Sequence, residues 1–176
     1  MIKKLKNKKG FTILESIVAI FVLSLSISGV FTAVQQSLSQ SIIAKDEVRA
    51  FYLAQEAIEI IRNKRDANQL ADINNGPTDW LEGVVSASDC PFNGVCKVDA
   101  TAIDKIQVCS GSCENLKQDS NFRYGYLSGN TTNINREIRI ESVGVNEITV
   151  TAIITWTKGA LPPFTFKVKT HLFNWI

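Results

Sequence analysis

The sequence predicts an α+β fold in which one long N-terminal helix packs on a C-terminal antiparallel β-sheet. An apolar run near the N-terminus is long enough to cross a membrane, and an amphipathic helical pattern continues it. In the C-terminal region, residues 131–176, apolar and polar side chains alternate with the period of a half-buried strand. These patterns indicate a helix whose first half lies in a membrane and whose second half lies outside it, and a sheet with one face covered.

The charge of the chain is distributed unevenly along its 176 residues. The formal net charge of +2 includes five lysines and no acid within residues 1–10. The remaining residues carry 14 basic and 17 acidic side chains, a balance of about −3. No basic stripe is evident after the N-terminus, so we expect no direct nucleic-acid binding.

Residues 11–34 are predicted to form a transmembrane helix. Glu15 is the only ionisable side chain among these 24 residues, and a helix of that length spans about 36 Å, against about 30 Å of hydrocarbon. The preceding lysines predict a cytoplasmic N-terminus and an exported C-terminal part. A cleaved secretory signal peptide is a weaker interpretation, because no A-x-A-like site follows and the helical periodicity continues.

Residues 35–65 are predicted to continue the helix to about Arg65, because no proline occurs before Pro77. Apolar side chains recur there at steps of three and four, and we expect this stripe to cover the sheet: Val48, Phe51, Ala54, Ile58 and Ile61. The apolar half also contains small residues, namely Ser24, Ser26, Ser28, Gly29 and Thr32. They fit either close helix packing in a membrane or a segment that loosens when its surroundings change.

Residues 66–130 are predicted to be loop-rich, with short strands within residues 95–100, 105–110 and 122–127. This region contains all four cysteines: Cys90, Cys96, Cys109 and Cys113. Their even number in an exported region favours two disulfides over free thiols. Zinc is disfavoured because the C-x5-C and C-x3-C spacings do not match zinc knuckles. Three connectivities are possible, of which we favour Cys90 with Cys96 and Cys109 with Cys113.

The C-terminal region is predicted to be an antiparallel meander of three strands. Ile138 and Ile140 alternate with charged residues in the first strand, and residues 147–156 and 164–172 repeat the alternation. A single apolar face results, and the amphipathic helix is the element available to cover it.

The sequence offers little support for catalysis or for a bound cofactor. The single histidine, His171, falls on the polar face of the last predicted strand, and no phosphate-binding glycine pattern is present. Asp119, Asn121 and residues 99–104 supply oxygen atoms, but without the dense spacing of a calcium loop. We therefore expect no enzymatic activity, no cofactor and no metal.

Glu15 is the residue of the apolar run that needs an explanation. Thr12 and Glu15 have the spacing of a capping box, and Glu15 is also close enough to the lysines to extend towards the lipid headgroups. A functional role is the third interpretation. A carboxylate in hydrocarbon is unfavourable by a few kcal/mol, about 3, and therefore indicates a positively charged partner.

The stretch from Lys9 to Glu15, KGFTILE, resembles the processing signal of type IV prepilins and type II secretion pseudopilins. It combines a lysine-rich leader, a Gly-Phe junction, a glutamate at the fifth residue after that junction and a continuing apolar helix. The resemblance implies that a prepilin peptidase cleaves after Gly10, removes residues 1–10 and methylates the new amine of Phe11. It also implies that Glu15 meets the Phe11 amine of a neighbouring subunit during filament assembly.

The family resemblance also implies partners and a location. The partners are the prepilin peptidase, other pilins or pseudopilins, an inner-membrane assembly platform and membrane lipid. The location is the bacterial cytoplasmic membrane, with a single pass, followed by a pilus or pseudopilus at the cell surface. Residues 52–66 and the ending from Thr151 onward resemble minor pilins of the pilus-modification type and type I pseudopilins. Unlike many major pilins, the span contains no proline.

Two further interpretations stay open. One is a permanently anchored single-pass surface protein that binds a ligand or adheres to a surface. The other is a subunit of a DNA-uptake pilus, in which DNA contact is made elsewhere in the filament. Retention of residues 1–10 in the mature protein would favour the permanent anchor.

Overall fold

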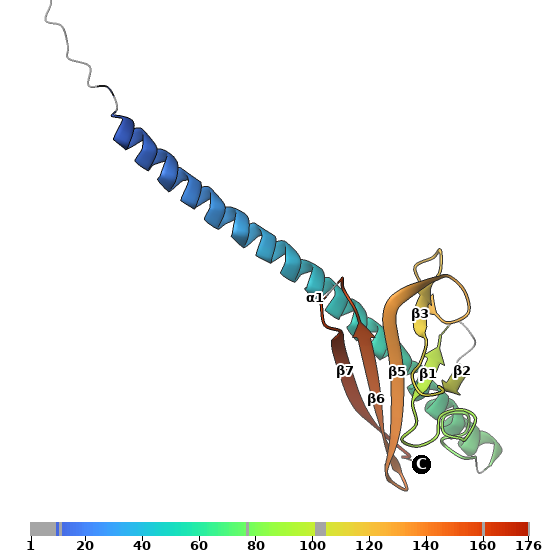
Figure 1. Cartoon of the computed structure of the whole chain (residues 1–176). Helices are drawn as coiled ribbons and strands as arrows, with labels where there is room; N and C mark the ends of the chain where they lie inside the picture. The colour runs from blue at the N-terminus through green and yellow to red at the C-terminus, as the bar shows by residue number, and fades with distance from the viewer. Residues whose placement is uncertain (1–9, 11, 77, 101–104, 160, 176) are drawn as a thin grey trace, which may run out of the picture. The chain divides into compact units, whose positions relative to one another are not determined.

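The computed structural model describes residues 10, 12–76, 78–100, 105–159 and 161–175. They form one helix and seven strands: α1 (Ile13–Asn75), β1 (Cys96–Asp99), β2 (Lys105–Val108), β3 (Asn115–Gln118), β4 (Tyr124–Gly125), β5 (Asn130–Gly144), β6 (Glu147–Trp156) and β7 (Phe164–Phe173) (Figure 1). The chain divides into an N-terminal unit, Met1–Lys45, and a globular unit, Asp46–Ile176. The predicted α+β fold, with a long helix packed on an antiparallel sheet, is confirmed.

Helix α1 begins after a local cap and propagates without a helix-breaking residue. The Oγ1 of Thr12 accepts a hydrogen bond from the Glu15 N–H at 3.3 Å, which is the N-cap arrangement. The helix ends at Asn75, and Gly76 then adopts a φ of 97°, as expected for the glycine that follows a helix. The expectation that it would end near Arg65 was wrong.

Tertiary hydrogen bonds explain why the helix continues past Arg65 despite its polar sequence. The Asn68 Nδ2 donates to the carbonyls of Trp80, at 3.2 Å, and Glu82, at 2.8 Å. The Asn68 carbonyl accepts the Thr78 hydroxyl at 3.0 Å. The loop after the helix therefore folds back on its last turns and stabilises them, a contact that local propensity does not encode.

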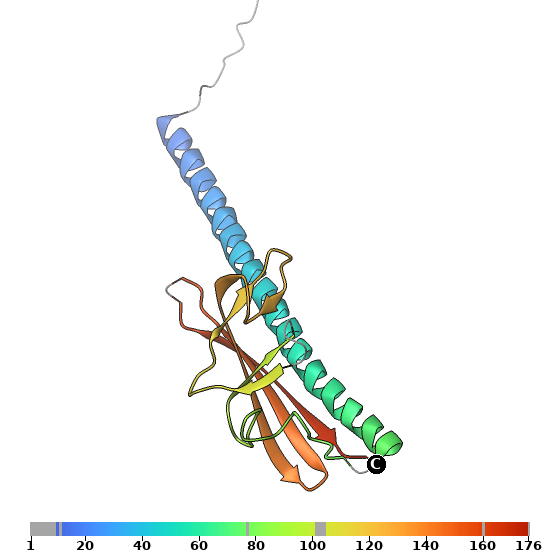
Figure 2. The ribbon, with the colours of Figure 1, turned by 90° about the vertical axis from the view of Figure 1, so that its right-hand side faces the viewer.

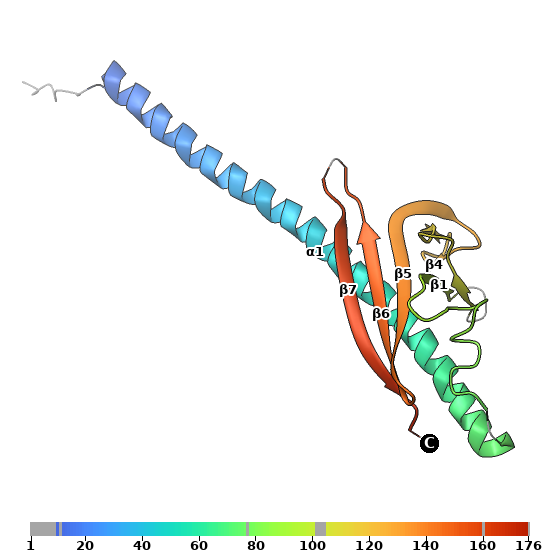
Figure 3. The same ribbon diagram turned by 60° about the horizontal axis from the view of Figure 1, so that its bottom comes forward.

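The central strand of the sheet is β5. One of its edges pairs with β6 along its length, and the other pairs with β3 and, at Ile138, with β1. β6 also pairs with β7, which forms an edge of the sheet (Figure 3). The predicted antiparallel meander is thus present as β5, β6 and β7, while β3 was not predicted.

The core of the globular unit lies between α1 and the inner face of this meander (Figure 2). The inward-facing residues of β6 are those that the alternation predicted, and all are buried: Ile148, Val150, Ala152, Ile154 and Trp156. On the helix, Ala54, Ile58 and Ile61 are buried as predicted, but Val48 and Phe51 are 56% and 46% exposed. The buried stripe is centred instead on Ala50, Leu53, Ala54, Ala57 and Ile61.

Candidate functional site

The N-terminal segment that the sequence singled out lies at the start of α1. Gly10 is exposed, and Phe11 and the lysines of residues 1–9 lie outside the described residues. Thr12 caps the helix by accepting the Glu15 N–H, and the Thr12 carbonyl accepts the N–H and the hydroxyl of Ser16. The first turn therefore has its backbone donors partly satisfied by the chain itself.

Glu15 lies in this first turn on an exposed part of the helix. Among the residues that the structure describes, its carboxylate makes no hydrogen bond and no ion pair. Its backbone takes part in the cap, which is one half of the capping box. The carboxylate itself is thus available to a group from outside the described chain.

The N-terminal part of α1 carries a long, largely apolar surface. Ile13, Leu14, Phe21 and Phe31 are each more than 60% exposed, and this helix is long and apolar enough to cross a membrane. The four hydroxyls in its middle donate to carbonyls one turn earlier, at 2.8–2.9 Å: Ser24 to Ile20, Ser26 to Val22, Ser28 to Ser24 and Thr32 to Ser28. Such local bonds satisfy hydroxyls in hydrocarbon, where water is absent.

The cysteine-containing region is fastened by two disulfides, Cys90–Cys96 and Cys109–Cys113. Between them and β4, the Asp119 carboxylate accepts the N–H groups of Asn121 and Arg123 and the Arg123 guanidinium at 2.8–2.9 Å. These bonds, foremost the backbone N–H of Arg123, lower the pKa of Asp119. The Asp119 oxygens are therefore used within their own turn, and part of the other oxygen-rich stretch, residues 101–104, lies outside the described residues.

The one histidine is placed where the alternation predicted it. His171 lies on the outer side of β7, and its Nδ1 is 2.7 Å from Glu147 Oε1 on the neighbouring strand β6. Within the described residues, no group of three or more His, Cys, Asp or Glu side chains is arranged to hold a metal ion. His171 and Glu147 form a surface pair across two strands.

Sequence reasoning missed a buried arginine that joins three elements. The side chain of Arg136 on β5 is fully buried and donates to the carbonyls of Leu53, at 3.1 Å, and Val98, at 2.6 Å, and to Glu56 Oε2 at 2.5 Å. Tyr126 donates its hydroxyl to the Arg136 carbonyl at 3.1 Å, and burial raises the pKa of that hydroxyl. The signal was present, because Arg136 shares the period of Ile138 and Ile140 and therefore faces inward.

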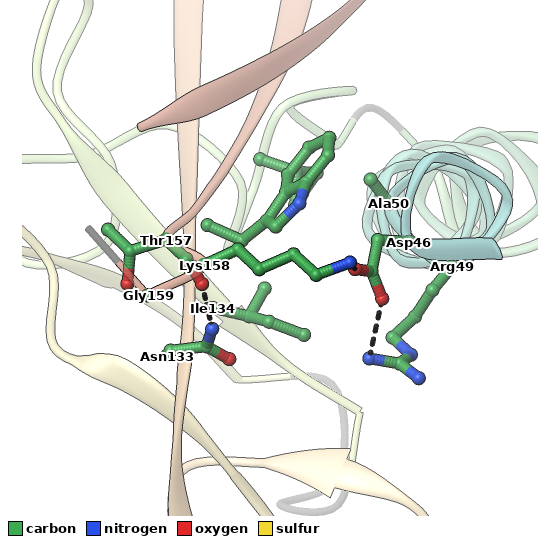
Figure 4. Close-up of a pocket in the computed structure, with 10 residues that line it drawn as sticks. Asp46, Arg49, Ala50, Asn133, Ile134, Thr157, Lys158 and Gly159 are labelled. Carbon is green, nitrogen blue, oxygen red and sulfur yellow. Dashed lines mark hydrogen bonds and ion pairs between the residues drawn. The ribbon is translucent and has the colours of Figure 1, made fainter. Parts of the chain in front are cut away.

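A polar pocket at the start of the globular unit was also not predicted. It is lined by residues of α1, β5, β6 and the loop after β6, including Asp46, Arg49 and Lys158 (Figure 4). Ile154 and Trp156 belong to the predicted strand at residues 147–156, but no pattern in the sequence singled out Asp46, Arg49 or Lys158. Only the fold brings the loop after β6 next to α1.

Comparison with known proteins identifies the N-terminal segment. Residues 5–31 match the family described as the prokaryotic N-terminal methylation motif, the signal of type IV prepilins and pseudopilins. The matched stretch includes Gly10, Phe11 and Glu15, and continues into the exposed apolar helix. No curated protein and no solved structure matches the chain. The motif is that of a structural protein family, and it implies processing by a prepilin peptidase and assembly with other pilins.

Proposed function

We propose that this type IV prepilin-like protein is a minor pilin or pseudopilin, a structural subunit that enters a filament through its N-terminal helix. The observation that carries the proposal is the methylation motif at residues 5–31, directly continuous with an apolar helix that is exposed on every side. In the proposed sequence of events, the peptidase cleaves after Gly10 and methylates Phe11. The subunit then leaves the bilayer for the filament, guided by the assembly platform.

The exposed apolar surface supports membrane insertion followed by helix packing. Side chains such as Ile13, Phe21 and Phe31 are mostly exposed and are stabilised by contact with lipid or with other helices. The lysines before the helix favour a cytoplasmic N-terminus, which places the cleavage junction on the cytoplasmic side and the globular unit outside. The same surface then serves two successive environments, first the bilayer and later the filament core.

Glu15 is assigned to subunit assembly. Its carboxylate has no partner among the described residues, and cleavage creates an amine at Phe11 that is charged near neutral pH, with an ordinary pKa of about 8. An incoming subunit gains a counter-charge for Glu15 when it meets the Phe11 amine of a neighbour. Such an ion pair fixes the position of one subunit along its neighbour more than it adds net stability, because removing both charges from water offsets most of their attraction.

Minor status, and a role without enzymatic activity, rest on the sequence. Residues 52–66 and the terminal strands resemble minor pilins of the pilus-modification type and type I pseudopilins. The single histidine, His171, and the lack of a phosphate-binding glycine pattern in the sequence support a structural role. The work of the chain, in this proposal, is assembly and presentation of the globular unit.

Intact-mass measurement of the protein purified from its own membranes tests the proposal. We expect loss of residues 1–10 and one added methyl group on Phe11. Gly10→Ala should leave the leader in place, while Gly29→Ala, a matched glycine substitution within the span, should leave cleavage unchanged. A native protein that retains Met1 to Gly10 would contradict the proposal and favour a permanently anchored surface protein.

The assembly role of Glu15 has a separate test. Glu15→Val should leave membrane insertion and cleavage intact but prevent recovery in sheared filaments, because the neighbour's amine then lacks its counter-charge. Ser16→Ala is the control, since it alters the adjacent residue and removes only a local hydroxyl bond to Thr12. Immunoblots of membrane and filament fractions would report both variants, and normal incorporation of Glu15→Val would refute the role.

A further inference from the structure

The polar pocket of the globular unit has a volume of about 220 Å³. Its wall on the α1 side is formed by Asp46, Arg49 and Ala50, and the opposite wall by Asn133 and Ile134 of β5 and by the end of β6 with the loop that follows. Figure 4 shows the Arg49 and Lys158 side chains on either side of Asp46. Elements distant in sequence thus form one small, defined cavity.

The apolar part of the pocket lining is buried and fixed in place. Ala50, Ile134, Ile154 and Trp156 are all buried. The Trp156 ring stacks on Phe164, with ring centroids 5.5 Å apart and an angle of 14° between the planes. The Asn133 Nδ2 donates to the Thr157 carbonyl, and the Leu161 N–H donates to the Lys158 carbonyl at 3.1 Å. The loop that carries Lys158 is therefore held by its own bonds and by β5.

The rim of the pocket has more positive than negative charge. Arg49 Nη1 is 3.4 Å from Asp46 Oδ1, and Lys158 Nζ is 3.9 Å from Asp46 Oδ2. Both distances exceed the roughly 2.7–2.9 Å of a charge-assisted hydrogen bond. Within the described part of the chain, neither cationic side chain donates a hydrogen bond. One carboxylate therefore faces two cations, which leaves a net charge of +1 and free N–H donors.

We infer that this pocket receives a carboxylate side chain, an aspartate or a glutamate, from a neighbouring subunit of the filament. The inference rests on the proposed function for the identity of the donor. The volume of 220 Å³ is below the roughly 300–1,000 Å³ of small-molecule sites and suits one side chain. The guanidinium of Arg49 presents a planar fork to a carboxylate, and Lys158 adds a second cation.

The charge of the surrounding chain agrees with this occupant. Residues 46–176 contain 13 lysines and arginines and 16 aspartates and glutamates, a balance of 13 − 16 = −3. A positive pocket in an acidic unit is complementary to the acidic surface of a neighbour with similar composition. The contact would also favour the one arrangement of two subunits in which an acidic side chain meets this pocket, because other parts of the two acidic units repel each other.

Binding of a small probe to the full-length protein in detergent micelles tests the carboxylate preference. The probe is N-acetyl-glutamate N-methylamide, and its matched control is the uncharged glutamine analogue. The indole N–H resonance of Trp156, assigned with Trp156→Phe, reports occupancy. We expect a saturable shift with the glutamate probe and none with the glutamine analogue.

Two substitutions with opposite expected effects separate a binding role from a structural one. Arg49→Gln should weaken binding of the glutamate probe by about tenfold, the loss in affinity expected for one charged hydrogen bond. Asp46→Asn should instead strengthen binding several-fold, because it raises the net charge of the rim from +1 to +2. A purely structural role for Asp46 predicts weaker binding in both variants. Equal shifts with the two probes, or weaker binding by Asp46→Asn, would overturn the inference.

The origin of the carboxylate is tested in cells. Lys158→Glu changes the rim from +1 to −1 and should lower recovery in sheared filaments, while Lys167→Glu on the outer side of β7 makes the same charge change away from the pocket and should not. Normal recovery of Lys158→Glu would overturn the neighbouring subunit as donor. An uncleaved N-terminus in the unmodified protein would overturn the proposed function instead, with the carboxylate preference measured in micelles unaffected.

Discussion

The two parts of α1 are one continuous helix with opposite relations to the rest of the chain. In the N-terminal unit, apolar residues occur on every side and are exposed, as with Ile27 at 60%. In the globular unit, apolar residues form a stripe and are buried, as with Ile61 at 0%. The helix therefore forms in both units, whether or not the rest of the chain covers its apolar side chains. The globular unit supplies its own partner, and the N-terminal unit depends on lipid or on other subunits.

Polar side chains differ between the two parts in the same way. The hydroxyls of Ser24, Ser26 and Ser28 bond to carbonyls one turn earlier in the same helix. Arg65 donates instead to the carbonyl of Phe173, at 2.9 Å, more than a hundred positions later. Local bonds are kept when the surroundings change, whereas long-range bonds tie the helix to one sheet. The N-terminal part can thus move between environments with its hydrogen bonds intact.

The largest expected effect is in the globular unit, at Arg136. Arg136→Ala should lower the free energy of unfolding by about 3–5 kcal/mol, because it removes a fully buried side chain together with its hydrogen bonds to the Leu53 and Val98 carbonyls and its ion pair with Glu56. Arg136→Lys should be intermediate, since one ammonium cannot reach both carbonyls. Arg139→Ala, on the opposite face of β5, is the control and should change stability by no more than about 0.5 kcal/mol. Denaturant unfolding followed by tryptophan fluorescence would measure all three.

A matched pair of isoleucines then compares the two parts of the helix directly. Ile61→Ala should destabilise the globular unit by about 2–5 kcal/mol through lost burial and a cavity. Ile27→Ala should leave unfolding of that unit unchanged and weaken only contacts with lipid or neighbouring helices. The same fluorescence measurement serves both variants. An equal loss of stability in both would show that the N-terminal unit contributes to the core after all.

A smaller effect is expected at Gly29, in the middle of the exposed part. Gly29→Ala should stabilise the helix locally by about 1 kcal/mol, because alanine is the better helix former and no atom lies within 4 Å of the added methyl. Ala33→Gly is the reverse substitution one turn later and should have the opposite sign. Amide hydrogen exchange of residues 25–33 in micelles would report both. Slower filament assembly by Gly29→Ala would identify a segment that loosens, whereas unchanged assembly would favour simple packing.

The smallest effect is expected at the cap. Thr12→Ala should cost the helix about 0.5–1 kcal/mol, since it removes the acceptor of the Glu15 N–H. Thr12→Ser keeps the acceptor and should behave like the native protein. The readout is amide exchange of Leu14 and Glu15, which should accelerate in Thr12→Ala alone. If stability of the globular unit also fell, the two parts of α1 would be more tightly coupled than their exposure indicates.

Patterns with a fixed period were predictable from the sequence. The alternation in residues 147–156 identified every inward-facing residue of β6, and the apolar run identified the helix that the methylation motif opens. Two predictions about α1 were wrong, namely which residues form its buried stripe and where the helix ends, and in both cases tertiary contacts decided the outcome. Val48 and Phe51 share the helical period with the core but are half-exposed, and Phe51 reaches the sheet only at its edge strand, where its ring contacts Phe166 of β7. Residues 66–75 are helical because the loop after them binds Asn68.

Features that depend on neighbours along the chain follow from the amino-acid order alone: the membrane-length helix, the Gly10–Phe11 junction with Glu15 at its fixed spacing, and the period of the strands. The packing of helix and sheet was needed to learn which face of α1 is buried, which acceptors Arg136 binds, and that Arg49 and Lys158 share Asp46. Local patterns follow from backbone geometry, which repeats every few residues. Contacts between distant residues follow from how closely the helix and sheet can pack, and that depends on all of their side chains together.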